Sequence, residues 1–557
     1  MGEEEENPHV HLAREYTEYL HNPNVYPPRA TNRQRINNSA LNKEEERLLS
    51  SKWRFIELNE IKDTVYTFKV AEVHKGRCRV VHSCKVNDGC KEQENQPPPI
   101  TLHSFEEVNK ILAEADFVTQ FDARSMYDQW GLEDEVGKYF VFKDRQGRYV
   151  ALNRLPMGFC YACGIAQGLS LILTTFSCDT EHYSVTVIVH LDNYLFAFKR
   201  KTSETDSQSK ELQKAVVSTI TTFLKRTITV DLQLNELDRE EIQMLLQQNE
   251  TTRWEKIKSL SPTKFTFLGV DYDLEAKKRT AAEKTWNKLA TLLAIIFPGG
   301  QLNPATTPRH LAMLMGVASW IKRVINIRHT NFNQYRNMAE LAYVLWLMPE
   351  MWDVPIAPVA FMFTDLFSIC KQLQSTKSAN HIYPELRQHN EVAICISDAS
   401  LVGWGAYIYL PRRHTWDFNM LQGKWPLVHK KPDRLYESST VAEPKAIEEI
   451  IALRPFPNSV RHVLFITDHS PLVAASRSQQ ARCYTYFKLL QKLEEEKYTY
   501  NLLFIKGELN IADAPSRGVE SIITRNEREA IAAGAGMGYA AALLSPSNHV
   551  PTVVGYV

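Results

Sequence analysis

Four short, largely apolar runs, each followed by an aspartate within two residues, limit what this chain can fold into. The runs and their aspartates are Phe117–Phe121 with Asp122, Val185–Leu191 with Asp192, Val392–Ile396 with Asp398, and Val463–Ile466 with Asp468. Runs of this length and composition are typical of buried strands. One aspartate after a strand is more often a turn or a helix cap. Several on neighbouring strands would supply the oxygen ligands that hard divalent cations require.

Composition sets wide bounds on the function. The 557 residues allow about three to five domains, and 44% hydrophobic with 23% charged residues is an ordinary globular balance. Lysine plus arginine equals aspartate plus glutamate at 65 each, so the overall charge does not indicate a nucleic-acid partner. Since the chain has no apolar run of about 18 residues, we predict no membrane partner. Nine cysteines without a framework pattern favour an intracellular location, in the cytoplasm or nucleus.

Three segments between residues 117 and 198 form the strongest local signal. Phe117–Asp122 is a predicted strand that ends in a carboxylate, Arg154–Phe159 leads into a predicted helix, and Val185–Phe198 is a predicted hairpin with an acid at its tip. Phosphoryl transfer by two metal ions about 3.5–4 Å apart needs carboxylates on adjacent elements. Asp122 and Asp192 are therefore the candidate metal ligands.

In this order and spacing, the three segments resemble motifs A, B and C of reverse transcriptases. The resemblance implies that Asp122 and Asp192 are catalytic and that Tyr127, five residues after Asp122, excludes ribonucleotides. The run Leu155–Gln167 resembles motif B, which packs on the templating base pair. The resemblance assigns the substrate to Met157 and Gly158 and the nucleic acid to Gln167.

Two flanking segments extend the resemblance. Lys75–Asn87 resembles the fingers segment whose basic residues hold the incoming triphosphate; Arg79 is the candidate, with Lys75 and Arg77 as alternatives, and a solvated charged hairpin is the other interpretation. Further along the chain, Phe267, Leu268 and Gly269 resemble the segment beside the primer grip, which implies contact with nucleic acid.

One position departs from the family pattern. Motif C ends in two adjacent aspartates, whereas this chain has Asp192 followed by Asn193. Asn193 keeps a carbonyl oxygen at the substrate site but removes a negative charge. This change predicts weaker metal binding or an altered metal preference. A completely inactive polymerase remains an alternative.

A second set of acids lies in the C-terminal third. Asp398, Glu443, Asp468 and Asp513 follow one another on predicted strand, helix, strand and loop, and this order resembles ribonuclease H. The run Asn510–Arg517 is the most specific part, and Glu508 stands where many relatives carry a histidine. The resemblance implies that all four acids are catalytic metal ligands that position water for attack on an RNA phosphodiester.

The resemblance implies an α+β multidomain fold, in which a right-hand polymerase precedes an α/β ribonuclease H-like domain. The predicted segments are a polar N-terminal extension (1–58), fingers and palm (59–275), a mostly helical thumb/connection (276–388), the ribonuclease H-like domain (389–520) and a flexible tail (521–557). The implied cofactor is Mg²⁺, two ions per active site, with Mn²⁺ as an alternative. The implied partners are an RNA template, a DNA primer, the RNA–DNA hybrid, deoxynucleoside triphosphates and other retroelement proteins, such as a recombinase or a Gag-like protein.

Within retroelements, the Asp-Asn variant of motif C and the Ala-Asp-x-x-Ser-Arg ending look most like the tyrosine-recombinase group, which includes the DIRS-like and VIPER-like elements. Two other interpretations remain open. One is a co-opted nucleic-acid-binding scaffold that keeps the fold without catalysis, which Asn193 and Glu508 favour. The other is an active ribonuclease H beside a silent polymerase.

Overall fold

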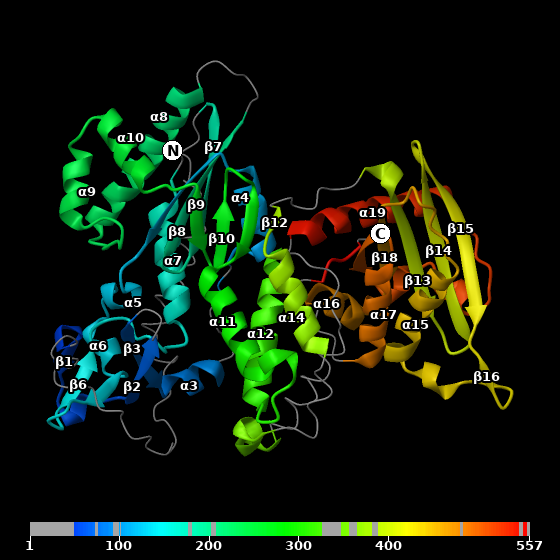
Figure 1. The fold of residues 1–557 in the computed structure, drawn as a ribbon, viewed down its shortest axis with the longest axis horizontal. Coiled ribbons are helices and arrows are strands. Elements are labelled where there is room, and N and C mark those ends of the chain that lie inside the picture. The colour runs from blue at the N-terminus through cyan, green and yellow to red at the C-terminus, as the bar shows by residue number, and fades with distance from the viewer. Residues whose placement is uncertain are drawn as a thin grey trace. The chain divides into compact units, whose positions relative to one another are not determined.

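The computed structural model describes residues 50–72, 76–92, 100, 102–176, 181–201, 208–325, 347–355, 365–380, 388–478, 483–544 and 550–553. The chain divides into two compact units, one from residues 1–103 and 114–262 and the other from 104–113 and 263–557. Both units mix helices and strands (Figure 1), as the sequence predicts. Most of the predicted N-terminal extension, residues 1–49, lies outside the described residues.

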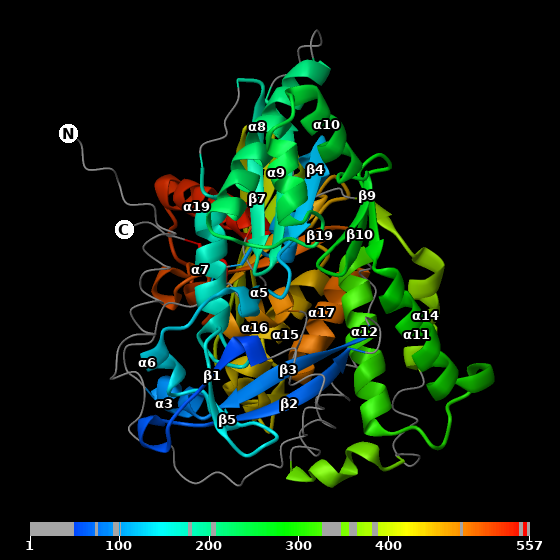
Figure 2. The same ribbon diagram turned by 90° about the vertical axis from the view of Figure 1, so that its left-hand side faces the viewer.

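A three-stranded antiparallel sheet lies at the centre of the first unit. Its order is β4 (Phe117–Asp122), β8 (Asn193–Arg200) and β7 (Tyr183–His190). Helices α7 (Ala162–Thr174) and α8 (Gln208–Thr229) pack against β7 (Figure 2). The two predicted strand-acid runs of this region therefore form neighbouring strands.

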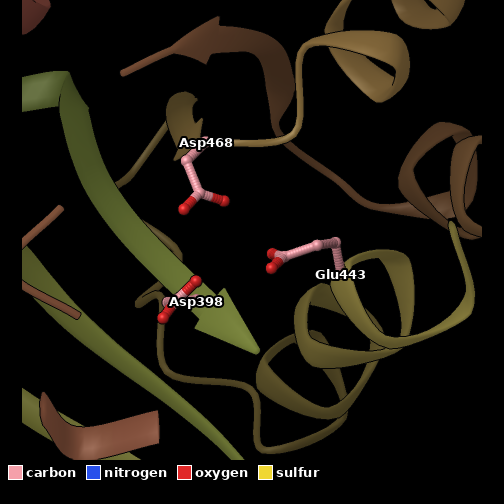
Figure 3. A group of neighbouring side chains, drawn as sticks. All are labelled: Asp398, Glu443 and Asp468. Carbon is pink, nitrogen blue, oxygen red and sulfur yellow. The ribbon is translucent and has the colours of Figure 1, made fainter. Parts of the chain in front are cut away.

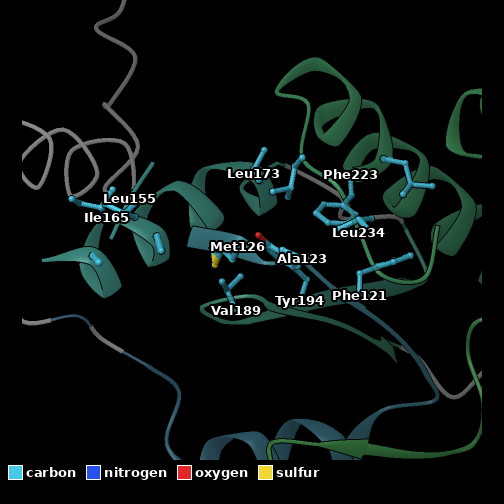
Figure 4. Close-up of a cluster of buried hydrophobic side chains, with 14 of the residues drawn as sticks. Phe121, Ala123, Met126, Leu155, Ile165, Leu173, Val189, Tyr194, Phe223 and Leu234 are labelled. Atoms are coloured by element: carbon cyan, nitrogen blue, oxygen red, sulfur yellow. The ribbon is translucent and has the colours of Figure 1, made fainter. Parts of the chain in front are cut away.

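Aromatic side chains fill the space between this sheet and α8. The ring of Phe223 on α8 lies 5.5 Å from Phe121 and 5.3 Å from Tyr194 (Figure 4). All three side chains are at most 1% exposed. Because such rings bury large apolar areas in fixed geometry, this core holds the end of β4 and the start of β8 in place.

Two smaller sheets complete the first unit. Strands β1 (Trp53–Phe55), β6 (Tyr149–Leu152) and β5 (Val141–Lys143) form one, and β2 (Val65–Glu72) pairs with β3 (Arg77–Cys84) in the other. The sequence predicted that the N-terminal extension continues to residue 58. This boundary is wrong, because residues 53–55 form β1, which hydrogen-bonds with β6. The remaining helices of the unit's described part are α3 (Val86–Glu92), α5 (Met126–Gln129), α6 (Asp134–Gly137), α9 (Arg239–Leu246) and α10 (Glu250–Ser259).

The second unit begins with a four-stranded sheet and helices. The sheet order is β12 (Ala379–Asn380), β11 (Lys278–Ala281), β10 (Val270–Asp273) and β9 (Lys264–Phe267). The helices are α4 (Phe105–Glu114), α11 (Glu283–Ile296), α12 (Pro308–Ile325) and α14 (Asp365–Thr376). Leu289, Leu292 and Leu293 of α11 are buried, in line with their predicted helical spacing.

A five-stranded mixed sheet forms the rest of the second unit. Its order is β15 (Thr415–Lys424), β14 (Gly403–Arg412), β13 (Val392–Ala399), β18 (His462–Thr467) and β19 (Thr499–Phe504). Strands β15, β14 and β13 pair antiparallel, whereas β13, β18 and β19 pair parallel. Helices α15 (Ser439–Ala452), α16 (Ser470–Ser478) and α17 (Tyr484–Glu495) contribute side chains to the hydrophobic core on one face.

The opposite face of this sheet is covered by α19 (Arg525–Leu544), where the sequence predicted a flexible tail. Ile531, Ala535 and Tyr539 of α19 are at most 5% exposed, and Tyr539 stacks on His462 of β18 at 4.5 Å. The prediction is therefore wrong for residues 525–544, which belong to the core of the second unit. Among the described residues, no helix is both long and apolar enough to span a bilayer.

Candidate functional sites

The sheet of the first unit places two predicted ligands at one edge. Asp122, the last residue of β4, lies opposite Asn193, the first residue of β8, and His190 pairs with Asn193 across the β7–β8 turn. Leu191 and Asp192 form that two-residue turn. The backbone N–H of Ala123 donates to the Asp192 carbonyl oxygen at 2.8 Å, which joins the two acid-bearing segments directly.

Gln167 holds this turn, although the sequence predicted contact with nucleic acid for it. Its side chain is 1% exposed. Its Nε2 donates to the Val189 carbonyl at 3.0 Å, and its Oε1 accepts from the Leu191 N–H at 2.8 Å. Leu191 has φ 55°, a conformation that costs a non-glycine residue about 1–2 kcal/mol. A buried amide therefore stabilises a strained turn, and the prediction of direct nucleic-acid contact is wrong for this side chain.

Glu236 is a carboxylate of this region that the sequence analysis missed. Both of its carboxylate oxygens accept from the backbone N–H of Asp122, at 2.9 and 3.0 Å, and burial raises the pKa of Glu236. It therefore anchors the end of β4. It lies within a polar stretch, residues 235–255, whose composition predicts exposure, so no sequence signal separated it from its neighbours.

A cavity of about 550 Å³ opens beside Asp122 and Asp192. It brings together six predicted residues: Arg79, Asp122, Tyr127, Met157, Asp192 and Asn193. Lys52, Arg124 and Arg154 add further positive charge to its wall, and Asp128 adds negative charge. A cavity of this size is within the range of small-molecule sites, and its mixture of cations and acids suits a triphosphate with its metal ions.

Tyr127 and Arg79 make defined contacts in this wall. The Tyr127 hydroxyl lies 3.2 Å from Cys163 Sγ, and burial, with smaller contributions from Cys163 and Asp192, raises its pKa well above the ordinary value. Tyr127 therefore presents a neutral ring. Arg79 Nε lies 3.0 Å from Glu72 Oε1. The two alternatives to Arg79 are not described in full: Lys75 and the side chain of Arg77 lie outside the described residues.

Gly158 is required by a close approach of two backbones. It has φ 113°, and a Cβ at this position would lie 2.0 Å from the His82 carbonyl oxygen. The His82 N–H donates to the Met157 carbonyl at 2.8 Å. The turn before α7 is therefore attached to β3, and this contact explains why the run contains glycine.

Phe267, Leu268 and Gly269 belong to the second unit, at the β9–β10 turn. Leu268 has φ 49° and Gly269 has φ 79°. Phe267 is 2% exposed, so its predicted contact with nucleic acid is wrong for the side chain. Leu268 and Gly269 are partly exposed at the tip.

Three predicted acids of the second unit converge. Asp398 on β13, Glu443 on α15 and Asp468 just after β18 each direct a carboxylate toward the others (Figure 3). One oxygen from each lies within 4.8 Å of the other two. The parallel pairing of β13 and β18 brings the two aspartates to the same sheet edge, as the sequence predicts. It is the only such cluster in the part of the chain that the structure describes.

Burial and mutual repulsion change the acidity of the triad. Burial, followed by the nearby charge of Asp468, raises the pKa of Asp398 to about 7. Burial, followed by Asp398 and Asp468, raises the pKa of Glu443 to about 9, and burial raises the pKa of Asp468. At neutral pH the cluster therefore retains a proton on Glu443 unless positive charge compensates the carboxylates.

Asp513, the fourth predicted acid, lies apart from the buried cluster. Its side chain is 54% exposed and lies 3.2 Å from Arg517 Nε, although its charge still contributes to the raised pKa of Asp398. The structure therefore brings three of the four acids together, and leaves Asp513 at the rim.

Two residues near Asp513 contact the triad, and the sequence analysis gave them no individual role. The Ser516 hydroxyl, 1% exposed, lies 3.1 Å from Asp398 Oδ2 and 2.6 Å from the Asp513 carbonyl. A hydrogen bond from the Asn510 side chain lowers the pKa of Asp468 against the larger effect of burial, and Asn510 Nδ2 also donates to the Ser397 carbonyl at 3.0 Å. The Asn510–Arg517 run contained the signal, but spacing alone did not indicate these contacts.

The triad fits a divalent cation. Its donors are carboxylate oxygens, the ligands that Mg²⁺ and Mn²⁺ prefer. Glu443 Oε2 is buried, and no described residue donates a hydrogen bond to it. A buried acceptor without a donor costs about 1–3 kcal/mol, a cost that a bound cation would offset.

No protein-family model matches this chain, and a comparison with curated proteins gives no match. Among solved structures, the chain is similar to foamy viral protease-reverse transcriptase in complex with double-stranded DNA, at 15% identity and a TM-score of 0.40, over 86% of this chain and 85% of that one. A complex of that protein with an RNA/DNA hybrid gives 14% identity and a TM-score of 0.41, over 90% and 58% of the two chains. Similarity at this level does not assign a function to this chain.

Proposed function

We propose that this chain is an RNA-directed and DNA-directed DNA polymerase joined to a ribonuclease H, which copies RNA into DNA and degrades the RNA of the hybrid. The observation that carries the proposal is the buried triad of Asp398, Glu443 and Asp468. It lies at one end of the interior strands β13 and β18 of a mixed sheet with the order β15-β14-β13-β18-β19. The sequence resemblance to ribonuclease H, which rests on the order of these acids along the chain, supports the same interpretation.

In the nuclease half, Asp398, Glu443 and Asp468 would hold Mg²⁺, or Mn²⁺ in its place. The bound ions would supply activation of water and compensation of the charge that develops on the phosphate. Ser516 and Asn510 hold two of the carboxylates in place. Asp513, exposed at the rim, is the acid best placed to complete a second ion site when substrate is bound.

In the polymerase half, the cavity beside Asp122 and Asp192 would receive the deoxynucleoside triphosphate. Arg79 would contact its phosphates, and the neutral ring of Tyr127 would leave no space for a 2′-hydroxyl. Asp122 and Asp192 would hold Mg²⁺ while the primer 3′-oxygen attacks the α-phosphate and pyrophosphate leaves. Met157, which lines the cavity, and Gly158 beside it in the turn before α7 would pack against the base pair.

A second candidate function is a ribonuclease H beside a silent polymerase. Asn193 Nδ2 donates to Asp192 Oδ1 at 3.1 Å, so an amide contacts one of the oxygens that a metal ion would need. A second acid at position 193 would repel Asp192 and favour cation binding instead. The contact between Asn193 and Asp192 would also fit a non-catalytic scaffold, but that function requires the triad of the second unit to be inactive as well.

Primer extension tests the polymerase half. A labelled DNA primer on an RNA template, with deoxynucleotides, is extended by the parent chain in Mg²⁺ or Mn²⁺ and not by Asp122→Asn. Asn193→Asp should increase extension in Mg²⁺ if the missing charge limits metal binding. Absence of extension by both the parent and Asn193→Asp would contradict the polymerase assignment.

The partners follow from this proposal: an RNA template, a DNA primer, the hybrid and deoxynucleoside triphosphates. An origin in a tyrosine-recombinase retroelement, and association with a recombinase or a Gag-like protein, stay predictions from the sequence resemblance.

A further inference from the structure

A short exposed hairpin lies between β15 and α15 in the second unit. It consists of β16 (Leu427–Val428) and β17 (Lys431–Pro432), joined by His429 and Lys430. Figure 1 shows it projecting beyond the end of β15. Every residue from 426 to 432 is exposed, so its side chains are available to a partner.

The hairpin is basic. Residues 427–432 read Leu-Val-His-Lys-Lys-Pro and include no acid, and Lys424 and Arg434 flank them. The one nearby aspartate, Asp433, accepts from the Leu435 N–H at 3.0 Å. Leu427 and Val428 are 67% and 49% exposed. The tip therefore offers cations beside apolar side chains, a combination that suits a sugar-phosphate backbone.

The turn is strained at the two residues that form its tip. His429 has φ 51° and Lys430 has φ 66°, and Val428 pairs with Lys431 across them. Two-residue turns with both φ values positive strongly favour Asn-Gly, because these residues adopt such angles at low cost. This chain has His-Lys instead, so the basic side chains stand where the backbone favours other residues. Strain retained in this way points to a function at the tip.

The hairpin is also anchored beside the triad. Asp398 pairs with Gly405, which pairs with Gln422, so β15 passes about 10 Å from Asp398, two strand spacings away, and ends two residues later. Trp425 Nε1 donates to the Ser400 carbonyl at 2.7 Å, and the Trp425 ring stacks on Tyr436 at 4.4 Å. These contacts attach the base of the hairpin to the residue that follows the Asp398 strand and to the short 3-10 helix η8 (Arg434–Glu437), which precedes the helix that carries Glu443.

We propose that this hairpin is a nucleic-acid-binding element, whose His429 and Lys430 contact the phosphates of the duplex while its cleaved strand lies at the triad. The proposal rests on the proposed ribonuclease H function and deepens it by adding a contact outside the carboxylate site. Leu427 and Val428 pack against sugars beside the contacted phosphates. Since the recognised groups belong to the backbone, the contact is independent of base sequence.

The test replaces the tip by the residues that its backbone favours. The full-length variant His429→Asn/Lys430→Gly removes the basic groups and should fold at least as stably as the parent. Binding of a fluorescent RNA–DNA hybrid, measured by anisotropy between about 50 and 200 mM salt, should weaken three- to tenfold. The slope of log K against log salt should become shallower by about 1–2, since the variant loses the phosphate contacts of both side chains.

A matched control removes a histidine and a basic side chain at the opposite end of β15 from the hairpin. Arg413 and His414 form the exposed β14–β15 turn, and Arg413→Ala/His414→Ala should keep the parent slope. A parental slope and affinity in the His429→Asn/Lys430→Gly variant, with hybrid cleavage by the parent intact, would overturn the hairpin proposal alone. Absence of hybrid binding and cleavage by the parent itself would overturn the proposed function, and the hairpin proposal with it.

Discussion

Ser516 connects the most specific sequence run of the second unit to its chemistry. Its buried hydroxyl lies 3.1 Å from Asp398 Oδ2, and this contact opposes the effect of burial, which raises the pKa of Asp398 to about 7. A Cβ on the neighbouring Gly405 would lie 2.3 Å from the Ser516 nitrogen. Glycine on β14 therefore permits the approach that brings this serine to the carboxylate.

Ser516→Ala should move the acidic limb of the pH profile of hybrid cleavage upward by about 0.5–1 pH unit. The reason is that one lost hydrogen bond is worth about 1 kcal/mol, and 1.36 kcal/mol corresponds to about one pKa unit. Asp398 must ionise to hold a cation, so a higher pKa delays the rise in activity. Ser516→Thr, which keeps a hydroxyl, should restore the parent profile; an unchanged profile in Ser516→Ala would show that the contact has no effect.

Gly158 and Gly147 form a natural pair for testing the close approach in the first unit. Both have positive φ, but a Cβ at Gly158 would meet the His82 carbonyl oxygen at 2.0 Å, whereas a Cβ at Gly147 has no atom within 4 Å. Gly147→Ala should lower the free energy of unfolding by about 1 kcal/mol through backbone strain alone. Gly158→Ala should cost at least about 2–4 kcal/mol, measured by urea unfolding. Equal losses would contradict the close approach.

Helix α19 shows why one element escaped prediction. Its Ala- and Gly-rich sequence reads as a tail of low complexity, yet small residues allow a helix to lie close to a sheet. A Cβ on Gly538 would lie 3.3 Å from Leu503 Cδ1 of β19. Composition identifies the lack of large apolar residues, but not the neighbouring surface that accepts small ones.

Tyr539→Ala should destabilise the second unit by about 3 kcal/mol, since a large buried side chain is removed. Met537, two residues earlier on α19, is 63% exposed, so Met537→Ala should change the free energy of unfolding by less than about 0.5 kcal/mol. Chemical denaturation of both variants measures the difference. Two equally small effects would support the flexible tail that the sequence predicted.

The predictable parts of the fold are those fixed by local pattern. The apolar runs that are followed by an aspartate predicted that Asp122, Asp398 and Asp468 lie at strand ends, because apolar β-rich runs indicate buried strands. The role of Gln167 was mistaken because burial of a helix residue depends on which turn the helix meets. Glu236, Asn510 and Ser516 act through contacts between segments distant in sequence, and a single sequence does not reveal such contacts.

At the scale of the whole molecule, the triad links stability to pH and to divalent cations. In the metal-free chain, the pKa of Asp398 is about 7 and that of Glu443 about 9, against ordinary values of 3.8 and 4.5. At pH values between the ordinary and the raised pKa of each group, the folded chain binds more protons than the unfolded chain. The stability that this difference provides is therefore fully present below about pH 4 and is lost as the pH rises toward 9.

Glu443→Gln should therefore be more stable than the parent at pH 9 in the absence of divalent cations, and close to the parent at pH 5. The difference in melting temperature at pH 9 should be a few degrees. Mg²⁺ should raise the melting temperature of the parent, since it binds the folded chain, and should raise that of the variant less. Parallel pH dependences in the two proteins, measured by thermal unfolding, would contradict the shifted pKa values.

Cleavage of a preformed hybrid tests the central claim most directly. RNA labelled at its 5′ end and annealed to DNA is incubated with the full-length parent, with Glu443→Gln, and with Glu449→Gln as a control on the same helix outside the triad. The account predicts Mg²⁺-dependent cutting of the RNA by the parent and by Glu449→Gln, and a loss of at least about 100-fold in Glu443→Gln. Equal cleavage by Glu443→Gln and the parent would contradict the assignment of the triad as a nuclease site.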